Sequence, residues 1–222
     1  MAQIIPTIIA KDFQELKKKI KQIEPFVEWA HLDVMDGEFV DNTTWNSPSD
    51  LRGLETNLKL EAHLMVKKPE DVIDNWIKSG VKRIIIHYES TKQLDKITKK
   101  IQDAGLEAGI ALNPETSVDV LDSLLRITDY GLRITILIMT VNPGFGGQEF
   151  LEAMLGKIMA LRKKYKDVKI EVDGGIGLET APKVIKAGAN VLAVGSAIFK
   201  SDNLKKTIEE LKSCKLLNAT AV

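Results

Sequence analysis

The chain has 222 residues, of which 44% are hydrophobic and 28% are charged, as expected for one globular domain with a full core. Lys plus Arg and Asp plus Glu each number 31, so the formal net charge is zero. This balance excludes the basic character typical of proteins that bind nucleic acid or anionic membranes, and we expect a small-molecule ligand instead.

Short runs rich in Ile and Val alternate along the chain with longer amphipathic segments. Such runs are typical of strands buried on both faces, as the strands of a parallel sheet are. In chain order the predicted strands are Ile4–Ile9, Trp29–Val34, Leu58–Met65, Arg83–His87, Glu107–Leu112, Arg133–Met139, Val168–Val172 and Val191–Val194.

The segments between the strands carry apolar residues at helical spacing, and several of them end at a glycine. The connection after the second strand is the exception, since it favours only a short helix near Asp50–Leu54. The other predicted helices are Asp12–Ile23, Pro69–Lys78, Lys92–Ala104, Ser117–Leu125, Gln148–Lys164, Thr180–Ala187 and Asn203–Leu211.

Eight strands that alternate with helices predict an α/β fold in the form of a closed (β/α)8 barrel. An open doubly wound sheet is the alternative, but eight units in 222 residues fit a compact barrel better. No Pro/Ser-rich linker or low-complexity tract marks a second domain, so we expect residues 1–222 to form a single barrel domain. Barrels of this kind keep their site at the C-terminal ends of the strands.

The single cysteine, Cys214, cannot form an internal disulfide, which favours a reducing compartment. The N-terminus lacks a basic region followed by a long apolar run, and no apolar stretch is long enough to span a bilayer. We therefore expect a cytoplasmic protein without a membrane or nucleic-acid partner.

Histidines and aspartates at the strand ends predict a metal site. His31 and Asp33 lie two apart on the second strand and face one side, His63 lies near the end of the third, and Asp173 follows the seventh. A lone histidine is often a satisfied core residue, but here imidazoles and carboxylates converge from several strands. Two buried carboxylates repel unless a cation lies between them. Two His and two Asp suit one divalent transition metal, and Zn, Fe, Mn and Co all accept such ligands.

His87 precedes Tyr88 and Glu89 at the end of the fourth strand. The sequence leaves three roles open for it: contact with a metal ligand, a structural role, or direct ligation.

Glycine-rich turns follow the sixth, seventh and eighth strands. Glycine lets backbone N–H groups approach an anion closely, so three consecutive turns of this kind predict a phosphate cradle, although each alone could be a tight turn. The predicted phosphate-binding residues are Gly144, Phe145, Gly146, Gly147, Gly174, Gly175, Gly195 and Ser196.

Four segments, at 31–37 (HLDVMDG), 61–65 (EAHLM), 139–148 (MTVNPGFGGQ) and 171–175 (EVDGG), resemble the signatures of the ribulose-phosphate 3-epimerase family. The resemblance covers nearly the whole chain, with the motifs in the family's order. It implies a (β/α)8 TIM barrel of the ribulose-phosphate-binding type.

The resemblance also implies an isomerase of the pentose phosphate pathway, which interconverts D-ribulose 5-phosphate and D-xylulose 5-phosphate at C3. It assigns the metal to His31, Asp33, His63 and Asp173, with Asp33 and Asp173 as the acid/base pair. This chemistry suits these residue types, because inverting a carbon beside a carbonyl needs a base on one face and an acid on the other. An enediolate forms between the two steps, and a divalent metal stabilises its negative charge.

Further positions match residues that surround the family's substrate, a phosphorylated ketose. Thr7 stands where the family has a serine, and His63 is expected to contact the substrate as well. Met35, Met65 and Met139 match the methionines that line the family's pocket, where they supply a polarisable apolar wall.

The chain departs from the family in the loop Asp41–Pro48 and at Glu61, where Asp is common, which leaves the sugar specificity open. One alternative is an epimerase of a hexulose phosphate such as D-allulose 6-phosphate. A related decarboxylase would use an Asp-x-Lys-x-x-Asp motif, but residues 33–36 read Asp-Val-Met-Asp without a lysine. A third alternative is a non-catalytic phosphate-binding barrel. Since such barrels commonly associate, we expect a homo-oligomer.

Overall fold

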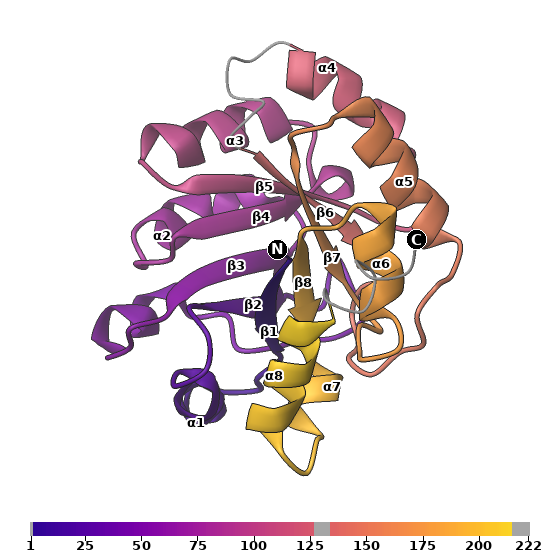
Figure 1. The fold of residues 1–222 in the computed structure, drawn as a ribbon. Coiled ribbons are helices and arrows are strands. Elements are labelled where there is room, and N and C mark those ends of the chain that lie inside the picture. The colour runs from indigo at the N-terminus through magenta and orange to yellow at the C-terminus, as the bar shows by residue number, and fades with distance from the viewer. Residues whose placement is uncertain (1, 127–133, 215–222) are drawn as a thin grey trace.

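A computed structural model describes residues 2–126 and 134–214, and its eight parallel strands close into a barrel in sequence order (Figure 1). The closed barrel confirms the predicted fold and excludes the open sheet. The strands are β1 Gln3–Ile8, β2 Trp29–Met35, β3 Lys59–Met65, β4 Arg83–His87, β5 Glu107–Leu112, β6 Ile134–Met139, β7 Lys169–Asp173 and β8 Val191–Val194.

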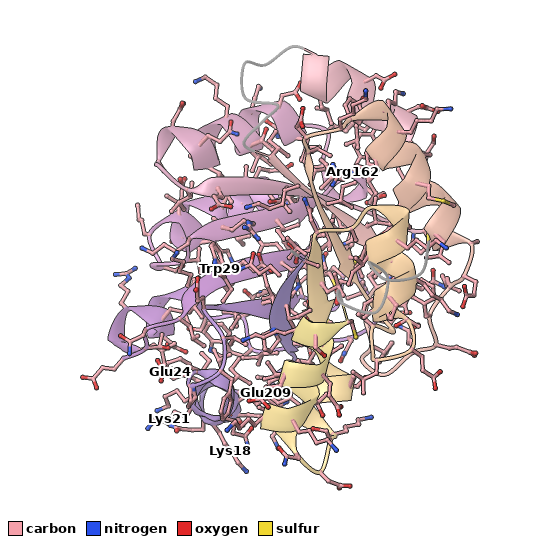
Figure 2. All side chains as sticks on the ribbon, viewed as in Figure 1. Lys18, Lys21, Glu24, Trp29, Arg162 and Glu209 are labelled. Atoms are coloured by element: carbon pink, nitrogen blue, oxygen red, sulfur yellow. The ribbon has the colours of Figure 1, made fainter. Side chains whose placement is uncertain are left out.

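Helices surround the barrel (Figure 1), and Figure 2 shows charged side chains such as Lys18, Lys21 and Glu209 on their outer surface. Among the described residues, no helix combines the length and the apolar character that crossing a membrane requires. The helices are α1 Phe13–Ile23, α2 Ile73–Ile77, α3 Leu94–Asp103, α4 Leu121–Arg126, α5 Met154–Lys164, α6 Ala181–Ala187, α7 Ser196–Phe199 and α8 Leu204–Ser213, with short 3-10 helices at Pro48–Gly53, Pro69–Asp71, Tyr88–Ser90 and Val118–Val120.

The predicted helix Gln148–Lys164 is wrong in its first turns, because α5 begins only at Met154. The side chain of Gln148 instead donates hydrogen bonds to the carbonyls of Asn142, at 2.6 Å, and Phe145, at 2.8 Å. These bonds close the glycine-rich loop after β6 and keep the following residues out of the helix.

Other boundaries differ by smaller amounts. The predicted helix Pro69–Lys78 is divided at Val72 into a 3-10 turn and α2, and the short helix expected near Asp50–Leu54 is the 3-10 helix that begins at Pro48. The four-residue helix α7 was not predicted. The predicted start of the sixth strand, Arg133, lies outside the described residues.

The register of the strands decides which residues meet inside the barrel. His31 pairs with Glu61, Asp33 with His63, and Met35 with Met65 across β2 and β3. Because side chains alternate between the two faces of a strand, these odd-numbered residues point inward, while their neighbours pack under the helices. The alternation along the sequence therefore places polar side chains in the barrel interior, one after another along β2 and β3.

Two glycine-to-alanine substitutions test this packing with opposite expected signs. A Cβ at Gly109 of β5 would lie 2.7 Å from Cγ1 of Ile85 inside the barrel, whereas a Cβ at the exposed Gly156 of α5 would meet nothing within 4 Å. We expect Gly109→Ala to lower the free energy of unfolding by about 1–3 kcal/mol through overpacking. Gly156→Ala should raise it by about 0.5–1 kcal/mol through helix propensity. Urea unfolding midpoints measure both, and an unchanged midpoint in Gly109→Ala would contradict the described packing.

Candidate active site

The structure brings the four predicted metal ligands together at the C-terminal ends of β2, β3 and β7. His31, Asp33, His63 and Asp173 are all buried, and one ligand atom from each lies within 4.8 Å of the others. Asp33 Oδ1 lies 3.1 Å from His31 Nε2 and 3.0 Å from His63 Nδ1. Asp173 Oδ2 lies 3.9 Å from His63 Nδ1. This cluster can hold a metal ion.

The second ring nitrogen of each imidazole faces away from the cluster and has its own partner. Nδ1 of His31 lies 2.7 Å from Glu61. Nε2 of His63 lies 2.9 Å from Nε2 of His87, whose Nδ1 lies 3.3 Å from Glu89. Metal-ligating histidines are commonly oriented in this way. The structure thus places His87 against His63, on the side away from the cluster.

The two aspartates have opposite electrostatic environments. Burial raises the pKa of Asp173 to about 8, and the negative charge of Asp33 contributes to this rise. Burial also acts to raise the pKa of Asp33, but hydrogen bonds from His31 and His63 outweigh it and hold the pKa below its usual value. At neutral pH one carboxyl is therefore charged and its neighbour is largely protonated.

The two histidines also differ. Burial acts to lower the pKa of His31, but its hydrogen bonds to carboxylates such as Asp33 outweigh burial and hold the pKa well above its usual value. Burial lowers the pKa of His63 to about 4, so this ring is neutral. A divalent cation would replace the proton on His31 and the proton on Asp173.

The ligand atoms fit a divalent transition metal. Two imidazole nitrogens and two carboxylate oxygens form a mixed nitrogen and oxygen set of the kind that Zn and its neighbours accept, whereas Ca and Mg prefer oxygen alone. The negative charge of Asp33 helps to raise the pKa of Asp173. A bound cation would relieve this repulsion between the two carboxyls.

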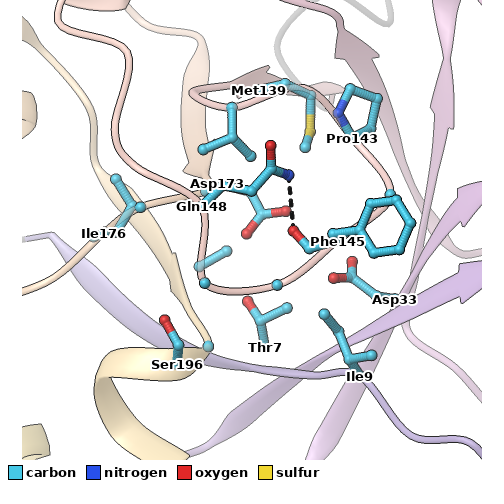
Figure 3. Close-up of a pocket in the computed structure, with 18 of the residues that line it drawn as sticks. Thr7, Ile9, Asp33, Met139, Pro143, Phe145, Gln148, Asp173, Ile176 and Ser196 are labelled. Atoms are coloured by element: carbon cyan, nitrogen blue, oxygen red, sulfur yellow. Dashed lines mark hydrogen bonds between the residues drawn. The ribbon is translucent and has the colours of Figure 1, made fainter. Parts of the chain in front are cut away.

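Above the cluster lies a cavity that is partly open to solvent (Figure 3). Asp33, Asp173 and the three predicted methionines line it. The hydroxyl of Thr7 also faces the cavity, and it is buried without a hydrogen-bond partner, so it is available to a ligand. His63 is fully buried and does not line the cavity, and its expected contact with the substrate stays a prediction.

The glycine-rich turns form the wall of the cavity beside β6, β7 and β8, where all eight predicted phosphate-binding residues lie. Two of the positions require glycine. Gly174 has φ 111°, and a Cβ there would lie 2.3 Å from Val141; Gly175 has φ 65°, and a Cβ there would lie 2.6 Å from the backbone nitrogen of Phe150. Backbone N–H groups and hydroxyls of these turns can contact an anion, and Lys200 lies close by, since a Cβ at Gly147 would be 3.4 Å from its Nζ.

The loop Asp41–Pro48, where the sequence departs from the family pattern, supports both halves of the site. Thr44 Oγ1 donates to the carbonyl of Asp33 at 2.8 Å and accepts from the N–H of Met35 at 2.9 Å. Asn42 donates to the carbonyl of Gly144 at 2.7 Å. The loop thus connects the metal-ligand strand β2 to the glycine-rich turn after β6.

Three buried charged residues below His31 were not predicted as part of the site. Glu61 and Glu171 both contact His31, and Arg83 donates hydrogen bonds to both carboxylates. Strand alternation is the signal that could have found two of them, because Glu61 and Glu171 lie two residues before His63 and Asp173 and share their faces.

Comparisons with known proteins point to one family. The profile of the Ribulose-phosphate 3 epimerase family matches residues 3–199. Ribulose-phosphate 3-epimerase of Bacillus subtilis (strain 168) is 40% identical over 223 residues, which cover 97% of this chain and 100% of the relative. The chloroplastic ribulose-5-phosphate-3-epimerase of Arabidopsis thaliana is 39% identical, covering 99% of this chain and 79% of the relative.

Among solved structures, KGPDC from Streptococcus mutans superposes with a TM-score of 0.71 at 14% identity, covering 96% of this chain and 97% of the other. A 3-hexulose-6-phosphate synthase gives a TM-score of 0.70 at 16% identity, covering 96% of this chain and 99% of the other. At these identities the likeness shows the barrel fold alone.

Metal binding should release protons, because His31 and Asp173 carry protons at pH 7 in the absence of a metal. We expect about two protons per Zn²⁺ ion at pH 7, and fewer above pH 8, where Asp173 is already ionised. Calorimetric titration in buffers of different ionisation enthalpy measures this number. Asp173→Asn, which has no carboxyl proton to lose, should release about one proton fewer. Binding heats that are the same in every buffer would contradict the described protonation.

Proposed function

The chain belongs to the ribulose-phosphate 3-epimerase family, and from this premise we propose that it interconverts D-ribulose 5-phosphate and D-xylulose 5-phosphate by moving a proton at C3. This is an isomerase reaction of the pentose phosphate pathway. One observation carries the proposal: two buried aspartates with opposite protonation face a single cavity, and glycine-rich turns suited to a phosphate form its wall.

We propose that Asp33 and Asp173 act as the acid/base pair. An inversion needs one group that accepts the proton from one face of C3 and a second group that donates a proton to the other face. In the absence of a metal, the surroundings hold the pKa of Asp33 below its usual value and raise the pKa of Asp173 to about 8, so Asp33 holds a proton less tightly than Asp173 does. This difference in proton affinity supports Asp33 as an acceptor and Asp173 as a donor, although a bound ion would replace the resting proton on Asp173. Pairs of carboxyls whose surroundings separate their pKa values are a common arrangement for this division of roles. In the reverse reaction the two side chains exchange roles.

We propose further that His31, Asp33, His63 and Asp173 hold one divalent ion, which is Zn, Fe, Mn or Co. When bound, the ion supplies positive charge that stabilises the negative charge developing on the substrate oxygens. Met35, Met65 and Met139 exclude water from the reacting carbon without competing for its proton. Thr7 offers its free hydroxyl to the sugar.

We propose that the phosphate group binds at the turns after β6, β7 and β8, which line the cavity. The cytoplasmic location, the homo-oligomer and the single domain over residues 1–222 that were expected from the sequence stay predictions.

Gly146→Val tests the phosphate cradle. A Cβ at this position would lie 2.9 Å from Cδ1 of Ile9, which is the far end of a flexible side chain, so the fold should accept the change. The added methyl groups would crowd the backbone N–H groups meant for the phosphate. Because a hydrogen bond to a charged group contributes about 1.5–3 kcal/mol, KM should rise at least about tenfold. Gly146→Ala should give a smaller rise, and the metal content should stay unchanged. A wild-type KM in Gly146→Val would remove this turn from the phosphate site.

Asp173→Asn tests the acid/base pair. The amide keeps the size of the side chain but cannot accept the proton, so net epimerisation should fall by at least about 100-fold. In Asp173→Asn, Asp33 should still exchange the C3 proton of one epimer with solvent. In Asp33→Asn, Asp173 should still exchange the C3 proton of the opposite epimer. Deuterium incorporation at C3 from heavy water, followed for each epimer separately in metal-loaded protein, measures both effects.

The same assay, run with two sugar phosphates, tests both the choice of substrate and the acid/base assignment. D-ribulose 5-phosphate and D-allulose 6-phosphate are compared as substrates of the wild type, and we expect the pentulose phosphate to be preferred. Near wild-type interconversion by metal-loaded Asp173→Asn would rule out the acid/base assignment. Turnover of neither sugar by the metal-loaded wild type would favour the non-catalytic barrel.

A further inference from the structure

Below the proposed metal ligands, the barrel interior holds a buried charged group made of Glu61 on β3, Arg83 on β4 and Glu171 on β7. All three side chains are fully buried and lie beneath His31. None of them lines the cavity or takes part in the proposed proton transfer. Burying three charged groups is costly unless their contacts compensate, so the contacts are informative about what the group does.

Each of the two carboxylates contacts both Arg83 and His31. Nη1 of Arg83 donates to Oε2 of Glu61 and, at 3.4 Å, to Oε2 of Glu171. The other oxygens of the same carboxylates, both Oε1, lie 2.7 Å and 3.1 Å from Nδ1 of His31. The guanidinium therefore fixes the two groups that in turn fix the imidazole ring.

We propose that Arg83 is a positioning residue for the metal site, a role that rests on the metal-binding function proposed above. With Nδ1 of His31 directed at Glu61 and Glu171, the ring plane is set and Nε2 points at Asp33, 3.1 Å away, where the metal would bind. Without the guanidinium, Nδ1 of His31 would be the contact that remains, of those described, between Glu61 and Glu171, so the two carboxyls would be free to shift and the ring would lose its orientation. The guanidinium suits this task better than an ammonium, because its planar fork holds several oxygens in fixed directions.

Glu107, which contacts Arg83 on the side away from His31, supplies a matched control. Nε and Nη2 donate to Oε2 of Glu107 at 3.0 Å and 2.7 Å, and the guanidinium carbon lies 4.5 Å from the centre of the Trp29 ring. Glu107 also accepts from Lys169 at 3.1 Å and is partly exposed to solvent. Glu107→Gln therefore disturbs Arg83 from the side away from His31 and leaves Glu61 and Glu171 in place.

The experiment compares Arg83→Met, Arg83→Lys and Glu107→Gln with the wild type, and its probe is Co²⁺. The Kd is measured by competition with a coloured chelator, and the visible absorption of bound Co²⁺ reports the coordination geometry. Since residues that orient metal ligands typically contribute 10–100-fold in metal affinity, Arg83→Met should weaken binding by about that factor and alter the spectrum. Arg83→Lys should restore part of the affinity. Glu107→Gln should stay within about twofold of the wild type, since it leaves both contacts to His31 intact.

A double variant, Arg83→Met with Glu171→Gln, covers the case in which Arg83→Met does not fold, because it removes one positive and one negative buried charge together. It should also bind Co²⁺ more weakly than the wild type. Wild-type affinity and spectrum in a folded Arg83→Met or double variant would overturn the proposal. An equal loss in Glu107→Gln would also overturn it, since the effect would then come from general destabilisation. If the wild type itself binds no Co²⁺, the proposed metal site fails, which is a different result from a failure of Arg83.

Discussion

Like charges buried inside a narrow barrel are the constraint on which the rest of this structure depends. Asp33, Glu61, Glu171 and Asp173 are the buried carboxyls of the described residues, and they crowd around His31. In the lower level, which holds Glu61, Arg83 and Glu171, the guanidinium and His31 contact both carboxyls and offset part of the repulsion, although burial and the charge of Glu61 still raise the pKa of Glu171 to about 7. In the upper level, which holds His31, Asp33, His63 and Asp173, no Lys or Arg of the described residues forms an ion pair with the carboxyls, and burial and the charge of Asp33 raise the pKa of Asp173 to about 8. That remaining imbalance makes the upper level suited both to a divalent cation and to proton transfer.

In the barrel interior, the residues that orient His31 are different from the residues that face the cavity. Because side chains two apart on one strand share a face, His31, Asp33 and Met35 of β2 follow one another along the barrel interior. Glu61, Arg83 and Glu171 are fully buried, and the two carboxyls orient the imidazole of His31 from its Nδ1 side. The upper level faces the cavity, and the glycine-rich turns beyond it leave room for an anion to approach the backbone.

The sequence predicted most of this arrangement, because strands buried on both faces and polar residues at strand ends leave clear local patterns. The cluster of His31, Asp33, His63 and Asp173 follows from placing each residue on its strand, as strand ends converge in a closed barrel. The start of α5 was not predictable from periodicity, since it depends on hydrogen bonds that Gln148 forms with carbonyls of the preceding loop. The role of Arg83 could not be predicted for another reason. Its partners Glu61 and Glu171 lie 22 and 88 residues away in the sequence and meet it only through the register of the strands.

We propose that the four side chains His31, Asp33, His63 and Asp173 hold one divalent ion and that Glu61 and Glu171 do not. The structure also contains a second group of buried ligand atoms, from His31, Glu61 and Glu171, which makes the claim specific. Anomalous X-ray diffraction at the Zn edge, from crystals grown with Zn²⁺, locates the ion directly. We expect a single peak at about 2.0–2.2 Å from Nε2 of His31, Nδ1 of His63 and the carboxylates of Asp33 and Asp173. A peak between Glu61 and Glu171, or none at the upper level, would contradict it.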